Sequence, residues 1–160
     1  MIKTNVMRIL DKMNVEYSVI TYDKKDDKID GVSVAKKIGR DAKCVYKTLV
    51  THGISKNVYV LLIPVREEID FKKAAKVTNE KRIEMLDLVD LQKYTGYIRG
   101  GCSPIGMKKQ YKTFIDKRAL EIEKIIVSGG KIGFQIEINA NVLKDIVDGE
   151  FDDLIKMTPT

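Results

Sequence analysis

The chain has 160 residues, of which 44% are hydrophobic and 32% are charged, and it carries a net charge of +6. This balance excludes a disordered chain, and the length suffices for one compact domain, expected over residues 1–157, that needs no disulfides. Two cysteines without a paired spacing, and no apolar run near the ~20 residues of a membrane span, exclude a disulfide scaffold and a membrane role and favour the cytoplasm.

The N-terminal pattern predicts two short helices around one strand. Apolar residues recur at helical spacing over residues 6–13, after a possible cap at Thr4, and a strand follows over residues 16–22. The charged run over residues 23–30 is interpreted as a solvated loop without a specific role. A short helix around residues 34–38 is then ended by the following glycine.

The middle of the chain predicts a hairpin. Residues 44–51 and 57–65 are β-branched and apolar, and the five-residue connector HGISK joins them. The second run is apolar on both faces and should be a central strand. Further elements are expected at 71–75 (helix), 82–85 (strand), 87–94 (helical turns), 112–115, 125–127 and 132–138 (strands), 142–147 (helix capped by Asn139 or Asn141) and 151–155 (a C-terminal helix).

These elements predict an α+β fold, with a mixed, mostly antiparallel sheet that curls toward a barrel and is flanked by helices. In the strand over residues 132–138, isoleucines and a phenylalanine alternate with Gly133, Gln135 and Glu137. One face of this strand is therefore expected in the core, and the face with Gln135 in solvent or a ligand space.

The segment over residues 95–109, TGYIRGGCSPIGMKK, holds four of the eleven glycines and no acid. Since the 29 lysines and arginines exceed the 23 acids by only six, the five cations between Asp90 and Asp116 account for nearly all of the excess. Glycines let backbone N–H groups curl around an anion, so this loop is a candidate phosphate-binding site. A hairpin with solvated lysines is an equally good interpretation of the segment alone. The five cations are Lys93, Arg99, Lys108, Lys109 and Lys112.

Lys47 is the most suggestive single residue. Strand alternation puts it on the same face as Val45 and Leu49, where an unpaired ammonium is costly and an anion should meet it. Such a lysine can hold a phosphate or polarise a carbonyl oxygen. The alternative, favoured by the strand alone, is a lysine whose stem lies on the core while its ammonium reaches solvent or guards a strand edge.

Few residues support the common kinds of catalysis. The single histidine, His52, has no acid at a spacing that would orient it, so we expect it to be exposed. With two distant cysteines it makes neither a zinc site nor a Cys-His pair, although a magnesium site of carboxylates alone stays open. Ser103 lacks a histidine base and is interpreted as a turn residue. Cys102 is a small turn residue or, less in keeping with its context, a reactive thiol.

Three motifs, VYKTLV, GYIRGGCSPIGMKK and VSGGKIGFQIEI, resemble in order and spacing the YbaK/EbsC family of free-standing Cys-tRNA(Pro) deacylases, which are related to the editing domain of prolyl-tRNA synthetase. The resemblance extends over almost the whole chain. It implies a barrel-like α/β fold that binds the aminoacylated 3′ end of tRNA, needs no cofactor, and works with prolyl-tRNA synthetase as a possible partner.

The resemblance also implies roles for single residues. Lys47 is the essential lysine and Tyr22 a pocket residue. Gln135 lies at a substrate-binding position where many relatives carry an acid. The residues of the loop that fixes the aminoacyl end are Gly100, Gly101, Ser103 and Pro104.

The mechanism that the resemblance implies needs no protein base, because the thiol of the substrate cysteine attacks its own carbonyl and leaves as a cyclic thioester. The protein then acts by orientation and charge stabilisation. Two alternatives stay open. One is a deacylase for another small residue, such as Ala-tRNA(Pro), and the other is a noncatalytic tRNA-binding module on a synthetase.

Overall fold

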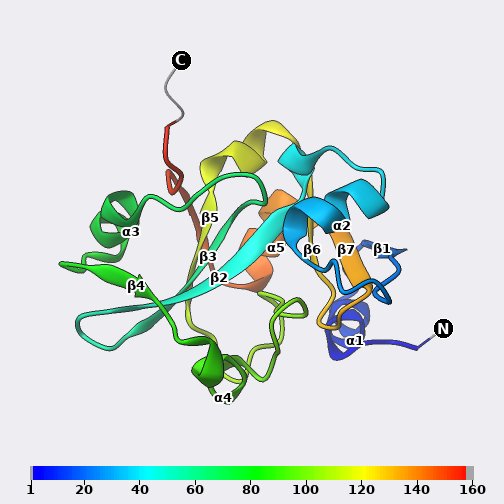
Figure 1. Cartoon of the computed structure of the whole chain (residues 1–160), viewed down its shortest axis with the longest axis horizontal. Coiled ribbons are helices and arrows are strands. Elements are labelled where there is room, and N and C mark those ends of the chain that lie inside the picture. Colours follow the sequence, from blue (N-terminus) through cyan, green and yellow to red (C-terminus); the bar gives the residue numbers. More distant parts are fainter. Residues whose placement is uncertain (1, 158–160) are drawn as a thin grey trace.

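A computed structural model describes residues 2–157 and shows short helices around two sheets, the α+β arrangement that we expected (Figure 1). The α-helices are α1 (Asn5–Lys12), α2 (Gly31–Lys37), α3 (Phe71–Thr78), α4 (Leu91–Thr95) and α5 (Ala140–Ile146). Short 3₁₀ helices are η1 (Ala42–Cys44), η2 (Leu88–Asp90) and η3 (Lys117–Glu121). The strands are β1 (Ser18–Thr21), β2 (Tyr46–Gly53), β3 (Val58–Pro64), β4 (Ile83–Met85), β5 (Lys112–Asp116), β6 (Lys124–Ser128), β7 (Phe134–Asn139) and β8 (Glu150–Asp152).

The strands form two sheets that meet at one point. The larger sheet has the order β4-β2-β3-β5-β8 and the smaller one β1-β7-β6. The pairs β2–β3 and β2–β4 are antiparallel, while β3–β5 and β5–β8 are parallel, so the larger sheet is mixed. A parallel bridge between Val45 and Ile126 connects the two sheets. The pairings among residues 2–157 leave both sheets open and do not close them into the barrel-like form that the sequence suggested.

The predicted hairpin and its central strand are confirmed. β3 lies between β2 and β5, and Tyr59 through Pro64 are buried. The connector is closed by the Gly53 N–H, which donates to the Asn57 carbonyl at 3.0 Å. Cys44, expected to begin the first strand, lies instead at the end of η1.

The helix ends follow from local capping. The Thr4 hydroxyl accepts a hydrogen bond from the Met7 N–H at 3.3 Å, and Asn139, rather than Asn141, caps α5 through the Val142 N–H at 3.1 Å. Gly39, with a φ of +67°, ends the turn after α2 as expected. These caps satisfy backbone groups that the helix leaves unpaired, which is why the sequence marked the ends correctly.

The predicted C-terminal helix is wrong. Phe151 pairs with Ile115 in the parallel β5–β8 ladder, and Ile155 forms an antiparallel bridge with Ile69. The apolar residues of this segment have helical spacing, but strand β5 offers an open edge, and the segment satisfies its backbone there. Leu154, whose N–H donates to the Asp116 carboxylate at 3.0 Å, is fully buried in this extended form.

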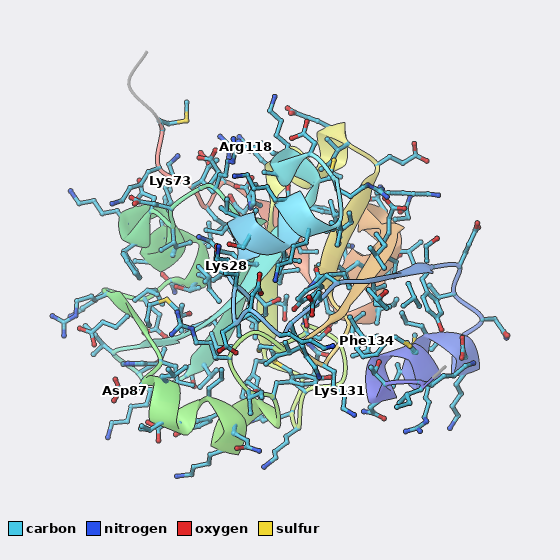
Figure 2. All side chains as sticks on the ribbon, turned by 45° about the vertical axis from the view of Figure 1, so that its right-hand side comes forward. Lys28, Lys73, Asp87, Arg118, Lys131 and Phe134 are labelled. Carbon is cyan, nitrogen blue, oxygen red and sulfur yellow. The ribbon has the colours of Figure 1, made fainter. Side chains whose placement is uncertain are left out.

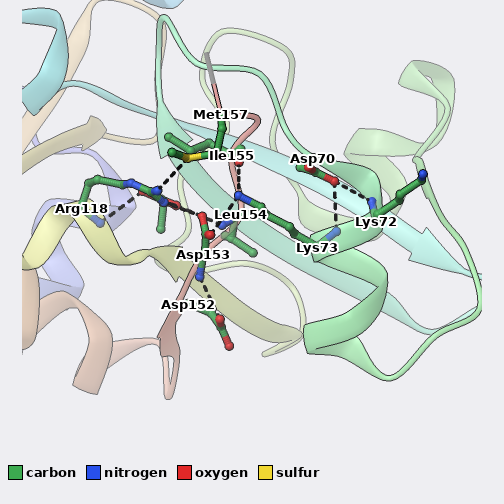
Figure 3. A network of polar contacts seen from close by, with 10 residues as sticks. Asp70, Lys72, Lys73, Arg118, Asp152, Asp153, Leu154, Ile155 and Met157 are labelled. Atoms are coloured by element: carbon green, nitrogen blue, oxygen red, sulfur yellow. Dashed lines mark hydrogen bonds and ion pairs between the residues drawn. The ribbon is translucent and has the colours of Figure 1, made fainter. Parts of the chain in front are cut away.

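A polar network fastens the same segment (Figure 3). The guanidinium of Arg118 donates to Asp116 at 3.0 Å and to Asp153 at 2.5 Å, and the ammonium of Lys73 lies 2.9 Å from Asp153. Lys73 also donates to the Ile155 carbonyl at 2.8 Å. Figure 2 places Lys73 and Arg118 at the same end of the molecule, away from Asp87, which precedes η2. The network is therefore a structural clamp at the end opposite η2 and α4.

Candidate functional site

A cavity of about 820 Å³ opens between the two sheets. One wall is the loop before α2 together with its first turn, from Asp27 to Val34. The second wall runs from Val45 to Val50 and consists of Val45 and the first part of β2. The remaining wall comes from the segment between β4 and α4 and from the glycine-rich loop, and Ser128 and Gln135 also contribute. Its volume matches that of a site for a small molecule or for the end of a larger one.

Lys47 lies on the β2 wall and is half-buried. Burial lowers the pKa of its ammonium, although the charges of Glu68 and Glu67 oppose that shift. The Lys47 ammonium has no ion pair or hydrogen bond with any of residues 2–157, unlike Lys37 and Lys73, which are both paired. A desolvated cation without a protein partner is suited to an anionic or carbonyl ligand.

The β2 wall also presents backbone groups to the cavity. The Val65 N–H donates to the Val45 carbonyl at 2.9 Å, and the Leu86 N–H donates to the Val50 carbonyl at 3.0 Å. In an antiparallel ladder, successive residues direct their backbone N–H and C=O alternately to the two sides of the strand. The backbone groups of Lys47 therefore bond to β3, like those of Val45, and the backbone groups of Thr48 point to the opposite edge of β2, like those of Val50. On that edge β4 reaches only the stretch from Thr51 to Gly53.

Within residues 2–157, then, no strand covers the Thr48 edge. The Thr48 hydroxyl is buried without a hydrogen-bond partner among those residues. Thr48 thus offers a main-chain donor and acceptor next to Lys47. No local sequence pattern indicates this edge, because the gap depends on how the two sheets meet.

The glycine-rich loop forms the wall at Arg99, Gly100 and Cys102. Gly100 has a φ of +86°, and a Cβ there would lie 2.7 Å from the Ile29 Cδ1 atom. Only glycine fits this position, because the left-handed backbone and the close contact both exclude a side chain.

The other predicted loop residues do not line the cavity. A Cβ on Gly101 would lie 3.2 Å from the Ile132 backbone nitrogen. Ser103 is fully buried, and its hydroxyl accepts a hydrogen bond from the Ile105 N–H at 3.2 Å. Pro104 is buried as well. Ser103 is therefore the turn residue that we expected.

Tyr22 follows β1, and its N–H donates to the carbonyl of Gly133, two residues before Gln135 of β7, at 3.0 Å. Gln135 is 6% exposed and lines the cavity. Tyr22 is half-buried beside the cavity without lining it, and its hydroxyl finds no hydrogen-bond partner among residues 2–157. Their roles in binding substrate stay predictions.

The charged loop over residues 23–30 is more specific than we expected. The ammonium of Lys37 donates to the Asp23 carbonyl at 2.7 Å, to the Asp26 carboxylate at 2.6 Å and to the Lys28 carbonyl at 2.9 Å. This holds the loop as the first wall of the cavity. The mixed charges of the run concealed this role, since such runs are usually solvated.

Of the two residues considered for catalysis by their side-chain type, His52 lies outside the cavity and Cys102 lines it. His52 is half-buried outside the cavity, and the β2–β4 pairing brings Glu84 to 3.8 Å from its Nε2 atom, an acid that sequence spacing did not reveal. Cys102 lines the cavity, and burial raises the pKa of its thiol to about 12. The Cys102 thiol is consequently neutral at physiological pH and a poor nucleophile. Across residues 2–157, no three His, Cys, Asp or Glu side chains gather closely enough to hold a metal ion.

Residues 30–146 match the family model of the aminoacyl-tRNA editing domain. The chain belongs to this editing-domain family. Lys47, Gly100 and Gln135, which line the cavity, lie inside the matched segment, and Tyr22 precedes it. Within the described part of this editing domain, no helix is long and apolar enough to cross a membrane.

Two curated relatives of this editing domain carry informative names. The Enterococcus faecalis protein named "Putative Cys-tRNA(Pro)/Cys-tRNA(Cys) deacylase EbsC" is 42% identical over 95% of this chain and 93% of its own length. A "Proline--tRNA ligase" of Wigglesworthia glossinidia brevipalpis is 31% identical over 71% of this chain, which corresponds to 20% of the ligase. The likeness to the ligase is thus confined to one part of that larger protein.

Solved structures share the fold of this editing domain. One described as a "putative trans-editing enzyme for prolyl tRNA synthetase" has a TM-score of 0.83 at 16% identity and covers 98% of this chain and 100% of its own. A second, of the hypothetical protein APE2540, has a TM-score of 0.87 at 16% identity and covers 96% of this chain and 100% of its own. At this identity the two structures establish the fold alone.

Proposed function

We propose that the protein is an aminoacyl-tRNA deacylase that removes cysteine from Cys-tRNA(Pro). The name of the Enterococcus faecalis relative and the editing-domain family support this substrate class. The single observation that carries the proposal is the half-buried ammonium of Lys47, which has no partner among residues 2–157 and lines the same cavity as Gly100 of the glycine-rich loop. A cation and backbone groups converging on one cavity suit the terminal ester of a charged tRNA.

In the proposed reaction the substrate thiol is the nucleophile. Its sulfur forms a bond to the carbonyl carbon of the cysteinyl ester, the bond from that carbon to the ribose oxygen breaks, and the thiol proton passes to this oxygen. The products are uncharged tRNA and a cyclic thioester. The proposed reaction consumes no oxidant and, as written, needs no metal ion or protein base.

Lys47 and Thr48 take the positioning role in this proposal. The Lys47 ammonium stabilises the negative charge that develops on the carbonyl oxygen, and the backbone N–H and C=O of Thr48 hold the ester and the amino group. The lowered pKa of Lys47 reflects its partial burial, and in such surroundings an electrostatic contact is stronger than in water. His52, the single histidine, lies outside the cavity, which fits a reaction without a histidine base.

The decisive experiment compares Cys-tRNA(Pro) with Ala-tRNA(Pro). We expect release of cysteine and little release of alanine, because alanine has no thiol to attack its own ester. Equal rates for the two substrates would rule out thiol assistance and favour a general deacylase of small residues. A protein that binds both without cleaving either would be a tRNA-binding module.

The Lys47→Met variant tests the central residue. Removal of one donor that stabilises developing charge lowers kcat by about 100-fold to 1,000-fold in known cases, and we expect a loss on that scale. The Lys43→Met variant, which changes an exposed lysine just before β2, is the matched control and should keep the original rate. An unchanged rate in Lys47→Met would remove that residue from the mechanism.

Prolyl-tRNA synthetase is the proposed partner. The 31% identity with a proline--tRNA ligase supports a shared substrate more directly than a physical complex. Addition of purified prolyl-tRNA synthetase to the deacylation assay tests the partnership. A complex predicts faster removal of cysteine from tRNA(Pro) than from a tRNA that the synthetase does not bind.

A further inference from the structure

Exposed lysines gather around two tyrosines at α4. The Lys93 Nζ lies 5.7 Å from the centroid of the Tyr94 ring, and the Lys109 Nζ lies 6.0 Å from the centroid of the Tyr111 ring. The two halves are linked, because the Tyr111 hydroxyl donates to the Tyr94 carbonyl at 2.7 Å. Helix α4 and the loop before β5 therefore form one continuous surface.

Lys108 joins this surface through its backbone and its stem. Its N–H donates to the Thr95 carbonyl at 3.1 Å, and its Cγ atom would lie 3.4 Å from a Cβ placed on Gly96. Gly96, with a φ of +85°, ends α4 and leaves room for the lysine stem. We call this the lysine–tyrosine surface, formed by Lys93, Tyr94, Lys108, Lys109 and Tyr111.

The lysines of this surface carry uncompensated charge. Lys93, Lys108 and Lys109 are exposed, and none of them forms an ion pair with an acid among residues 2–157. No acid occurs between Asp90 and Asp116 in the sequence. Lys37, by contrast, forms an ion pair with Asp26. Positive charge gathered on one surface is typical of a site that binds a polyanion.

The lysine–tyrosine surface adjoins the cavity across α4. Leu91, the first residue of α4, lines the cavity, while Lys93 and Tyr94 of the same helix belong to the surface. Arg99, which is exposed, follows α4 and also lines the cavity. A chain whose end lies in the cavity would therefore continue over α4 and meet the lysines.

We infer that the lysine–tyrosine surface binds the phosphates of the tRNA acceptor arm while the cavity holds its aminoacyl end. The inference rests on the proposed function and names the part of the protein that contacts the body of the substrate. An RNA backbone suits the surface better than an acidic protein does. Protein interfaces are depleted in lysine at their centre, whereas phosphates are held by lysines of this kind. The side chains of Lys93 and Lys109 lie against the half-buried rings of Tyr94 and Tyr111.

The test separates binding of the RNA body from chemistry at the ester. The variant Lys108→Glu/Lys109→Glu reverses two charges of the surface and leaves every cavity residue in place. Its substrates are Cys-tRNA(Pro) and 3′-O-cysteinyl adenosine, which has the ester but no acceptor arm. The control is Lys72→Glu/Lys76→Glu on α3, which changes the net charge equally at exposed positions away from α4 (Figure 1).

We expect kcat/KM for Cys-tRNA(Pro) to fall by about 10-fold or more in K108E/K109E, mainly through KM, and the cleavage of cysteinyl adenosine to stay unchanged. Each lost phosphate contact lowers the slope of log affinity against log salt by about 0.7 to 0.9, so anisotropy with uncharged tRNA(Pro) should show a slope reduced by about 1 to 2. The K72E/K76E control should keep the original slope and rate.

Several results would overturn the inference. One is a K108E/K109E variant that binds tRNA as tightly as the original protein. Another is a kcat/KM for cysteinyl adenosine that falls as much as the kcat/KM for Cys-tRNA(Pro). The third is an equal fall of kcat/KM for Cys-tRNA(Pro) in the K72E/K76E control. Failure of the proposed function has a different signature, because the anisotropy measurement needs no catalysis. A protein that binds uncharged tRNA through Lys108 and Lys109 but cleaves no ester would disprove the deacylase proposal and support the binding surface.

Discussion

The Nζ atom of Lys37 lies 5.7 Å from the centroid of the Tyr22 ring, so the cation that holds the loop over residues 23–30 also rests on a predicted pocket residue. Lys37 of α2 thus contacts the residue that follows β1 and also bonds to the loop after it. Its side chain is 19% exposed. The first wall of the cavity, which includes Asp27 and Ile29, is thus fixed by one side chain that does not itself line the cavity.

Replacement of Lys37 by Met should loosen this wall. Hydrogen bonds to a charged group contribute about 1.5 to 3 kcal/mol each when buried, and with partial exposure we expect the free energy of unfolding to fall by about 1 to 2 kcal/mol. We expect kcat/KM for Cys-tRNA(Pro) to fall several-fold, and Lys37→Arg to restore part of the loss. Denaturant unfolding and deacylation kinetics measure the two effects. Full activity in Lys37→Met, with Lys36→Met as the exposed control, would show that the loop holds its shape without Lys37.

A methyl group at Gly100 should damage the cavity. Gly100→Ala combines the strain of a positive φ with a contact of 2.7 Å to Ile29. The strain alone is on the order of 1 kcal/mol, and the contact adds a shift of the loop. Gly39 provides the control, because its φ is +67° but a Cβ there would meet nothing within 4 Å. We expect Gly39→Ala to lose stability only and Gly100→Ala to lose deacylation as well. Equal activity of the two variants would contradict the tight fit at Gly100.

Much of the fold could be predicted from local patterns. Thr4 and Asn139 cap helices because their side chains satisfy nearby backbone groups, and the continuous apolar run of β3 predicted a strand that is buried on both faces. The C-terminal segment could not be predicted, since its helical spacing is outweighed by a backbone partner, β5, that is distant in sequence. Long-range pairing of this kind leaves no mark on the segment itself.

The candidate site was predictable to a similar degree. Lys47 on an apolar strand face and the acid-free glycine loop were both visible in the sequence, and they line one cavity. The roles of Thr48 and Lys37 were not, because one depends on the gap between two sheets and the other on a side chain that reaches back to a charged loop. Sequence patterns indicate on which face of a strand or helix a residue lies, whereas the roles of Thr48 and Lys37 depend on which other segments lie next to them.

The clamp at Asp153 should make stability depend on pH. Burial alone would raise the pKa of this carboxyl group, but Arg118 and Lys73 bond to it and lower the pKa to about 2. A depressed folded pKa means that the ionised form stabilises the protein. This contribution is fully present above the ordinary carboxyl pKa of about 4 and is lost as the pH falls through about 2.

Asp153→Asn should therefore lower the free energy of unfolding at pH 7 by about 1 to 2 kcal/mol, after allowance for solvent screening of a partly exposed group. The difference between the variant and the original protein should shrink as the pH approaches 2. Denaturant unfolding at several pH values measures it. A difference that stays constant from pH 7 to pH 2.5 would show that the charge of Asp153 does not stabilise the fold.

Cys102 offers the sharpest check on which thiol performs the chemistry. It lines the cavity, so a protein thiol could in principle attack the ester in place of the substrate thiol. Because burial raises its pKa to about 12, only a very small fraction of Cys102 is thiolate at pH 7.5, and the thiolate is the nucleophilic form. We expect Cys102→Ala to cleave Cys-tRNA(Pro) within about twofold of the original rate, a change of under about 0.5 kcal/mol in the barrier.

Iodoacetamide should label Cys102 slowly in the folded protein and quickly after unfolding, as mass spectrometry of the labelled peptide would report. Loss of activity in Cys102→Ala, together with rapid labelling of the folded protein, would mean that the protein thiol forms the covalent intermediate, and the substrate-assisted mechanism would then be wrong.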